Sequence, residues 1–350
     1  MLTPSERRAI DRQNMFALLT GFPEQCRRAC DIARSAELPA AAPSFDHIVV
    51  TGMGGSAVGG ELLGGHLAGD IEIPVLVNRD YVLPRFVNRR SLVLACSYSG
   101  DTEETLSAVN SIDGRRATVI CIGSGGRLAQ LASENGYAHI KVPGGQPPRT
   151  ALGYLFIPLL ITLERFGLID ARSDLEETLE DLETRVRTLS RIEQEDNPAR
   201  RLAQQLVKRV PLVYGSREPN AALPTRWRNQ FSENAKVLAF SNLLPELNHN
   251  EIVGWSESSS ILDQAHVVLL RDRDEIARVK ARFDISREII ERHSVRCSEC
   301  SSEGGSRLCR TFSLIVLADF TSYILALLNR QDPTPIENID ILKRKLERLT

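Results

Sequence analysis

Short apolar runs alternate with helix-like segments along most of this 350-residue chain, and this alternation constrains the fold more than any other feature. In the first half the apolar runs are residues 48–51, 74–77, 92–96, 117–122 and 139–142. Runs of this length, bounded by turns, are typical of strands buried in a parallel sheet. Because helical patterns separate them, the sequence predicts an α/β fold with doubly wound, mainly parallel sheets and flanking helices.

A second set of alternating segments begins near residue 200. We expect strands at 210–216 and 265–270, and helices at 201–208, 223–240, 274–293, 308–329 and 335–349. The two halves look like a distant internal repeat, and a cleft between two such sheets is a natural ligand site. We predict a helical N-terminal segment (1–45), a first domain (46–170), a connecting helix (171–200) and a second domain with a C-terminal helix (201–350).

Composition excludes several classes of function. The net charge is only -2, without a basic run, which argues against a nucleic-acid partner. We expect no membrane partner, because we find no apolar run that approaches the roughly 20 residues of a membrane span. The charged N-terminus lacks the apolar centre of a secretion signal. Seven cysteines, mostly in apolar runs, fit reduced thiols, so we expect a cytoplasmic protein.

The most informative stretch is residues 92–110. An apolar run leads directly into Ser97, Ser99, Gly100 and Thr102, and a helical pattern follows. Hydroxyls at a strand-to-helix junction lie beside the free N–H groups and the positive dipole end of the helix, where an anion is stabilised. A single serine there would more simply cap the helix. Three hydroxyls and a glycine within six positions favour phosphate binding.

A glycine-rich segment at residues 52–60 follows the first predicted strand. It is compatible with a dinucleotide-binding fingerprint, and so with a nicotinamide-dependent oxidoreductase. That fold needs an acidic residue about 20 positions further on to hold the ribose. Glu72 precedes the second strand and Asp80 lies late, so this alternative is the weaker one.

Five short motifs occur in a fixed order: GMGGS (52–56), SYSGDT (97–102), PR (148–149), ENAK (233–236) and NHNE (248–251). Together they resemble the bifunctional phosphoglucose/phosphomannose isomerases, which are built from two sugar-isomerase (SIS) domains. The resemblance extends from about residue 48 to the C-terminus. The serine loop alone marks any SIS domain, whereas ENAK combined with NHNE is more specific to the isomerases.

The resemblance implies a role for individual residues. The sugar phosphate would bind to four hydroxyl residues beside the glycine loop, namely Ser56, Ser97, Ser99 and Thr102, with Gly54 and Gly55. Glu233 would move a proton between C1 and C2, and Arg149 would lie near these carbons. His249, donated by the neighbouring subunit of a homodimer, and Lys343 would open the sugar ring, with Lys345 as an alternative to Lys343. The substrates would be glucose 6-phosphate, mannose 6-phosphate and fructose 6-phosphate, without a cofactor.

The chemistry of these side chains suits an enediol mechanism. One carboxylate must take a proton from carbon and return it to the neighbouring carbon, which suits Glu233 if burial raises its pKa. Arg149 could stabilise the enediolate oxygen because its charge persists at any working pH. Glu251 and the flanking amides could orient His249. From position alone, Glu233 and His249 would more simply be surface residues, and Arg149 could equally cap the nearby helix or pair with a surface acid.

Two further alternatives concern regulation and metal binding. A non-catalytic SIS module that senses a sugar phosphate would need the serine loop but neither Glu233 nor His249. Cys297 and Cys300 have the spacing of zinc ligands, but no second such pair accompanies them. We therefore expect no metal site.

Overall fold

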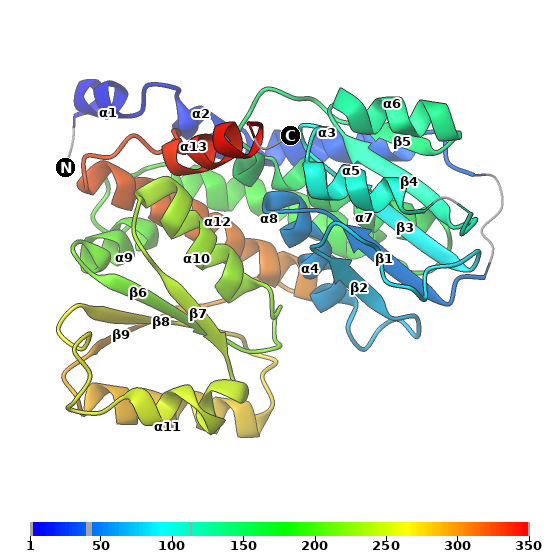
Figure 1. The fold of residues 1–350 in the computed structure, drawn as a ribbon. Coiled ribbons are helices and arrows are strands. Elements are labelled where there is room, and N and C mark those ends of the chain that lie inside the picture. The colour runs from blue at the N-terminus through cyan, green and yellow to red at the C-terminus, as the bar shows by residue number, and fades with distance from the viewer. Residues whose placement is uncertain (1–2, 40–43, 113, 349–350) are drawn as a thin grey trace.

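The computed structural model describes residues 3–39, 44–112 and 114–348. Figure 1 shows two lobes, each built around one sheet, with a layer of helices between them. Both sheets are entirely parallel in their strand pairings. The predicted α/β fold with two parallel sheets and flanking helices is therefore confirmed. The domain boundaries near residues 45, 170 and 200 remain predictions.

The first sheet has five strands in the order β2-β1-β3-β4-β5. They are β1 (His47–Thr51), β2 (Val75–Asn78), β3 (Ser91–Cys96), β4 (Thr118–Gly123) and β5 (Ala138–Lys141). The helices that follow β1, β3 and β4 are α4 (Gly55–Leu67), α5 (Glu103–Asn110) and α6 (Gly126–Asn135). Every residue of β3 is buried, which explains its unbroken apolar sequence.

The second sheet has four strands in the order β7-β6-β8-β9. They are β6 (Val210–Gly215), β7 (Phe240–Leu243), β8 (Ala265–Arg271) and β9 (Arg296–Ser301). Sequence analysis found β6 and β8 but missed both edge strands. The predicted helix over 223–240 was too long, because α10 (Leu223–Ala235) ends where Lys236 adopts a left-handed φ of 57°.

Long helices join the two sheets. They are α3 (Phe22–Ser35), α7 (Leu152–Arg165), α8 (Arg172–Leu189), α9 (Pro198–Leu206) and α12 (Arg307–Leu328). α7 packs on α3, whereas α8, α9 and α10 all pack on α12. One continuous apolar cluster includes residues of both sheets, such as Ile48 and Val268. The two lobes therefore share a core, which fixes the position of one relative to the other.

The N-terminal segment contains α1 (Pro4–Ile10) and α2 (Met15–Thr20) before α3 begins. The buried Asp11 accepts hydrogen bonds from the Met15 and Phe16 amides at 2.7 and 3.0 Å. Its carboxylate also accepts one from the Tyr323 hydroxyl on α12 at 3.0 Å. This segment is therefore attached to the central helix of the molecule.

Helix α12 corrects one expectation from the sequence. Within the described residues it is the one helix long and apolar enough to cross a membrane, with a mean hydropathy of 1.9 in its most apolar window. In the fold 89% of that window is buried. Its apolar length is explained by its place in the core, where α8, α9 and α10 cover it.

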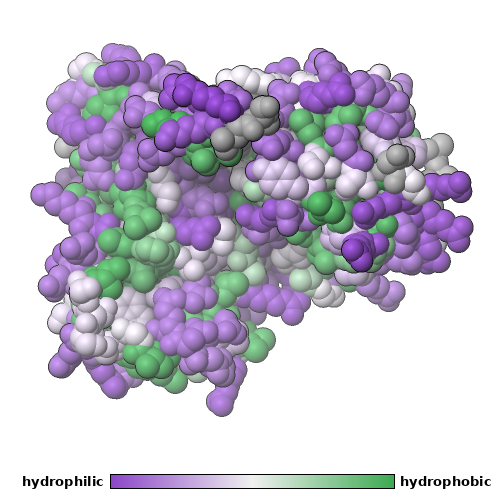
Figure 2. Space-filling view, viewed as in Figure 1, coloured by the Kyte–Doolittle hydropathy of each residue, from purple (hydrophilic) through white to green (hydrophobic). Residues whose placement is uncertain are grey.

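The last helix, α13 (Glu337–Leu346), contrasts with α12. None of its residues is buried, and its apolar side chains Ile339, Leu342 and Leu346 are exposed. Figure 1 shows α13 at the top of the molecule, and Figure 2 shows the surface hollowed below it, between the two lobes.

Candidate active site

The hydroxyl loop, residues 97–102, lies between the end of β3 and the start of α5. Ser97 is fully buried, and its Oγ lies 2.8 Å from the Thr102 Oγ1. The same Oγ accepts hydrogen bonds from the Gly100 and Thr102 amides at 3.1 and 3.3 Å. The Ser99 hydroxyl accepts one from the Asp101 amide at 3.2 Å. The loop therefore gathers these three hydroxyls at the N-terminus of α5.

Gly100 determines the shape of this loop. Its φ is 84°, and a Cβ at this position would lie 1.8 Å from the Gly125 carbonyl oxygen. Asp101 then accepts a hydrogen bond from the Arg127 amide, at the start of α6, at 2.8 Å. Since no larger residue fits, Gly100 lets the hydroxyl loop pack directly on the turn after β4.

The glycine loop lies beside the hydroxyl loop because β1 and β3 are neighbours in the sheet. Ser56 is buried in the first turn of α4, and its Oγ accepts a hydrogen bond from the Tyr98 amide at 3.3 Å. Gly54 has a positive φ of 53°. A Cβ on Gly55 would lie 3.1 Å from the Pro148 carbonyl oxygen. The glycine loop thus lies between the hydroxyl loop and the turn that carries Arg149.

Arg149 joins the two lobes. Its side chain is only 3% exposed and comes from the turn Pro148–Thr150 after the first sheet. It donates from Nε to the Asn234 Oδ1 at 2.6 Å, and from Nη2 to the Pro333 and Thr334 carbonyls at 2.8 Å each. Its Nη1 lies 3.4 Å from the Glu233 Oε2. Burial lowers the pKa of the Arg149 guanidinium, whereas the Glu233 carboxylate acts in the opposite direction.

Glu233 lies in the last turn of α10, and its side chain is 30% exposed. Behind it, α10 is fixed on α12 by the buried Arg226, whose Nη2 donates to both carboxylate oxygens of Asp319 at 2.7 and 2.9 Å. Asn234 adds a hydrogen bond to the Ser322 hydroxyl at 3.0 Å. Glu233 is therefore held on a rigid helix, beside a buried cation, with its carboxylate still open to solvent.

Lys236 is a site residue to which sequence analysis gave no role. Its ammonium donates to the Glu233 carbonyl and, at 3.2 Å, to the Pro333 carbonyl. The pKa of Lys236 is lowered to about 8, mainly because burial reduces the hydration of the ammonium. The positive charge of Arg149 also lowers it. The ENAK motif contained the signal, but the contact with Pro333 cannot be read from it.

His249 lies elsewhere in the chain's own fold. It ends the short turn Glu246–His249 and is exposed, and its imidazole has no hydrogen-bond partner among the described residues. The preceding Asn248 donates to the Ser286 hydroxyl of α11 (Ala277–Glu291) at 2.7 Å. The expectation that Glu251 orients His249 is wrong, because the Glu251 carboxylate accepts from the Tyr214 hydroxyl and the Asn242 amide.

Lys343 and Lys345 lie on α13 and are exposed. Within the described chain, neither side chain forms an ion pair or hydrogen bond with Arg149 or Glu233. The structure thus brings together the two loops, Arg149 and Glu233, but does not bring His249 or Lys343 to them. A role for His249 and Lys343 stays a prediction.

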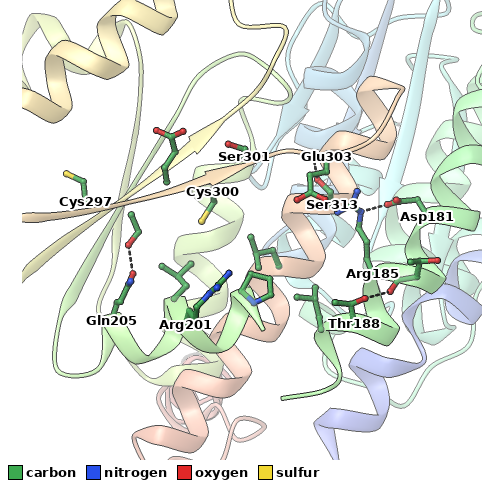
Figure 3. A pocket seen from close by; sticks show the side chains of 17 residues that line it. Asp181, Arg185, Thr188, Arg201, Gln205, Cys297, Cys300, Ser301, Glu303 and Ser313 are labelled. Atoms are coloured by element: carbon green, nitrogen blue, oxygen red, sulfur yellow. Dashed lines mark hydrogen bonds and ion pairs between the residues drawn. The ribbon is translucent and has the colours of Figure 1, made fainter. Parts of the chain in front are cut away.

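A cavity in the second half of the chain lies away from these residues. It has a volume of about 830 Å³ and lies between β9 and helices α8, α9 and α12. Figure 3 shows its polar lining, which includes the ion pair of Arg185 with Asp181, the Gln205 amide and two cysteines. Burial raises the pKa of both Cys297 and Cys300 to about 12, which disfavours the thiolate that a metal would need. The described residues contain no cluster of three or more metal-ligating side chains of the His, Cys, Asp or Glu types.

The arrangement combines an anion site with acid–base chemistry. Hydroxyls and helix N-termini gather at the strand ends of the first sheet, where a phosphate would be stabilised. A carboxylate and a buried guanidinium are paired beside the turn that Gly55 contacts. A small molecule that carries both a phosphate and an acidic C–H group matches these two features.

Known proteins resemble this chain over nearly its whole length. A bifunctional phosphoglucose/phosphomannose isomerase of Caldicellulosiruptor bescii is 42% identical over 334 residues, which cover 95% of this chain and 98% of the relative. The chain belongs to the bifunctional phosphoglucose/phosphomannose isomerase family. An isomerase of the same name from Aquifex aeolicus is 36% identical over 307 residues, which cover 87% of this chain and 91% of that relative.

Other comparisons agree with membership of this isomerase family. The model of the bacterial phospho-glucose isomerase C-terminal SIS domain matches residues 195–346. A hypothetical protein from Thermus thermophilus has the same fold, with a TM-score of 0.73 and 17% identity, over 99% of this chain and 94% of that structure. The resemblance found in the sequence is therefore confirmed, and the nicotinamide-dependent alternative is not supported.

Proposed function

We propose that this protein interconverts glucose 6-phosphate and mannose 6-phosphate with fructose 6-phosphate through an enediol intermediate. Membership of the isomerase family supports the reaction. In the structure the proposal rests on the pair of Arg149 and Glu233, beside a loop rich in hydroxyl groups. The Nη1 atom of Arg149 lies 3.4 Å from the Oε2 atom of Glu233. We expect the protein to be cytoplasmic.

The phosphate would bind in the first lobe. Ser97 and Thr102 are hydrogen-bonded to each other in this structure, and a phosphate would take over these hydroxyls as donors. The free amides at the start of α4 and α5, together with their helix dipoles, would add to the attraction. Ser56 and Ser99 border the same space. Gly54 and Gly55 let the backbone approach the anion without a side chain in the way.

The proton transfer would take place in the second lobe. The Glu233 carboxylate would take the C2 proton from the open aldose and return it to C1. A proton would also pass from the C2 hydroxyl to O1, and together these transfers convert the aldehyde into the ketone of fructose 6-phosphate. The Arg149 guanidinium would stabilise the enediolate oxygen that forms between these steps. Glucose 6-phosphate and mannose 6-phosphate differ only at C2, so both give the same enediol. One base can therefore serve both substrates.

Ring opening needs a second set of groups. We propose that the protein acts as a homodimer in which His249 of one copy reaches the site of the other. Lys343, or else Lys345, would assist from α13. The exposed positions of His249 and α13 leave these groups available for such contacts.

Replacing the base tests this function. Glu233→Gln should lower kcat by about 10²–10⁴-fold, because it removes the group that carries the proton. Binding of fructose 6-phosphate, measured by calorimetry, should remain within a few-fold of wild type. Glu180→Gln, at an exposed position on α8, is the matched control and should leave kcat unchanged. Wild-type protein that binds sugar phosphates without interconverting them would instead favour a sensor of the SIS class.

A further inference from the structure

Lys236 has no part in the chemistry described so far, although it lies beside Glu233. It follows α10 directly, in a left-handed conformation with φ 57° and ψ 34°. This conformation turns the chain away from the helix axis. Its ammonium reaches back to the Glu233 carbonyl and across to the Pro333 carbonyl. A lysine that only capped the end of a helix would need the first contact but not the second.

The Pro333 carbonyl is shared by two cations. Arg149 donates to it at 2.8 Å and Lys236 at 3.2 Å. Arg149 also donates to the next carbonyl, that of Thr334. Glu233 lies between these cations, with its carboxylate beside Arg149 and its carbonyl bonded to Lys236. The link between α12 and α13 is thus joined to both sides of the proposed base.

Several charged groups face the Lys236 ammonium from every surrounding element. They are Arg149 from the turn after the first sheet, Glu233 on α10, Asp332 in the link after α12 and Glu337 at the start of α13. The three acids raise the pKa of Lys236, whereas low hydration and Arg149 lower it to about 8. The ammonium therefore loses its proton as the pH rises through about 8.

We propose that Lys236 is a positioning residue, which holds Glu233 in place for proton transfer by linking the end of α10 to the Pro333 carbonyl. This inference rests on the proposed isomerase function. In its charged form Lys236 also places a positive charge near the Glu233 carboxylate. Both effects weaken when the ammonium becomes neutral.

Kinetics of two variants test this role. Lys236→Met should lower kcat by about tenfold or more, with KM within about twofold, because the base is misplaced while the phosphate site is intact. Lys236→Arg keeps the charge and should recover most of kcat. In wild type, kcat should fall as the pH rises through about 8. Lys236→Arg should remain active above that pH, because a guanidinium stays charged there.

Lys208→Met is a matched control. Lys208 also follows a helix, is exposed, and has the same φ of 57°, but it lies in the turn before β6. Substitution by Met should therefore disturb the backbone equally without a kinetic effect. If Lys236→Met keeps a wild-type kcat and a wild-type pH profile, Lys236 has no positioning role and the proposal fails.

Chemical labelling gives a readout that does not depend on turnover. Limited acetylation with acetic anhydride, followed by mass spectrometry, measures the fraction of Lys236 present as free amine. Glu233→Gln removes a negative charge beside Lys236, which should lower its pKa and increase its labelling at pH 7.5 about twofold, while Lys208 should not respond. If wild type does not interconvert hexose phosphates, the proposed function fails. If Glu233→Gln leaves the labelling of Lys236 unchanged, these two residues are not coupled, and this outcome is independent of the proposed function.

Discussion

The two lobes share parallel sheets but present opposite ends of their helices to the candidate site. In the first lobe the site residues lie at the N-termini of α4 and α5, where uncharged hydroxyls accompany free backbone amides. In the second lobe they lie at the C-terminal end of α10, where Lys236 and Arg149 bring positive charge. Helix dipoles favour an anion at the first position and cations at the second.

This difference suggests a division of labour. In the proposed function the first lobe binds the phosphate through hydroxyls and backbone amides, so positive charge is concentrated where the reacting carbons would lie. Substitutions in the first lobe should then mainly change substrate binding, and those around α10 should mainly change the rate.

Loss of the Arg149 guanidinium should have the largest effect. Arg149→Met removes a partner of Glu233, Asn234 and the Thr334 carbonyl, and leaves the Pro333 carbonyl with Lys236 alone. We expect a loss of about 3–5 kcal/mol in the free energy of unfolding. In the fraction that folds, kcat should fall by about 10²-fold or more because the enediolate loses its stabilising charge. Chemical denaturation and steady-state kinetics measure the two effects.

Arg165→Met is the comparison for Arg149→Met. Arg165 also donates to two backbone carbonyls, those of Ala33 and Ala36, but far from the site. It should cost some stability and leave kcat intact. An equal loss of kcat in both variants would mean that Arg149 acts only through the fold.

The next largest effect should come from Gly100→Ala in the first lobe. A methyl group at this position would overlap the Gly125 carbonyl, so the hydroxyl loop must move. We expect a loss of about 2–4 kcal/mol in stability and a raised KM. Gly114→Ala is the control, because it has a similar φ of 74° but no atom within 4 Å of the new Cβ. It should cost only the strain of the left-handed backbone, about 1 kcal/mol. If both variants lose the same stability in thermal unfolding, backbone strain rather than the contact with Gly125 explains why a glycine is needed at position 100.

The contrast between the lobes also explains what could be predicted from the sequence. β3 and the hydroxyl loop are contiguous and strongly patterned, so both were found from residues alone. Strands β7 and β9 were missed because both are edge strands without a continuous apolar run, and only pairing with a neighbour defines them. The end of α10 was missed because Lys236, rather than glycine or proline, makes the left-handed turn.

The second-lobe site depends on contacts between distant parts of the chain. Arg149 and Glu233 are 84 positions apart, and Lys236 and Pro333 are 97 positions apart. No local pattern encodes such pairs, so the roles of Arg149 and Glu233 came from the resemblance to a family. Lys236 belongs to the ENAK motif, but its contact with the Pro333 carbonyl depends on where the link after α12 lies in the fold.

Ser97→Ala should have a smaller effect that separates binding from rate. It removes a buried hydroxyl that contacts Thr102 and two amides. We expect KM to rise about tenfold while kcat stays within about threefold, since the proton-transfer groups are unchanged. Ser107→Ala, on helix α5 after the hydroxyl loop and beyond the first helical turn, should change neither. A drop in kcat without a change in KM would contradict the division between the lobes.

The smallest change in activity should come from mixing two inactive variants. This experiment tests whether one chain supplies all the catalytic residues of its own site. Among the described residues His249 is exposed and makes no hydrogen bond or ion pair with Glu233 or Arg149, so the proposed role in catalysis calls for a second copy of the protein. If Glu233→Gln and His249→Ala subunits exchange freely in a dimer, half of the dimers are mixed, and each mixed dimer has one site with both wild-type residues. Activity should then recover to about a quarter of the wild-type value. If both residues act within one chain, mixing restores nothing, because every site lacks one of them. An active His249→Ala variant would remove this histidine from the mechanism and leave ring opening to other groups.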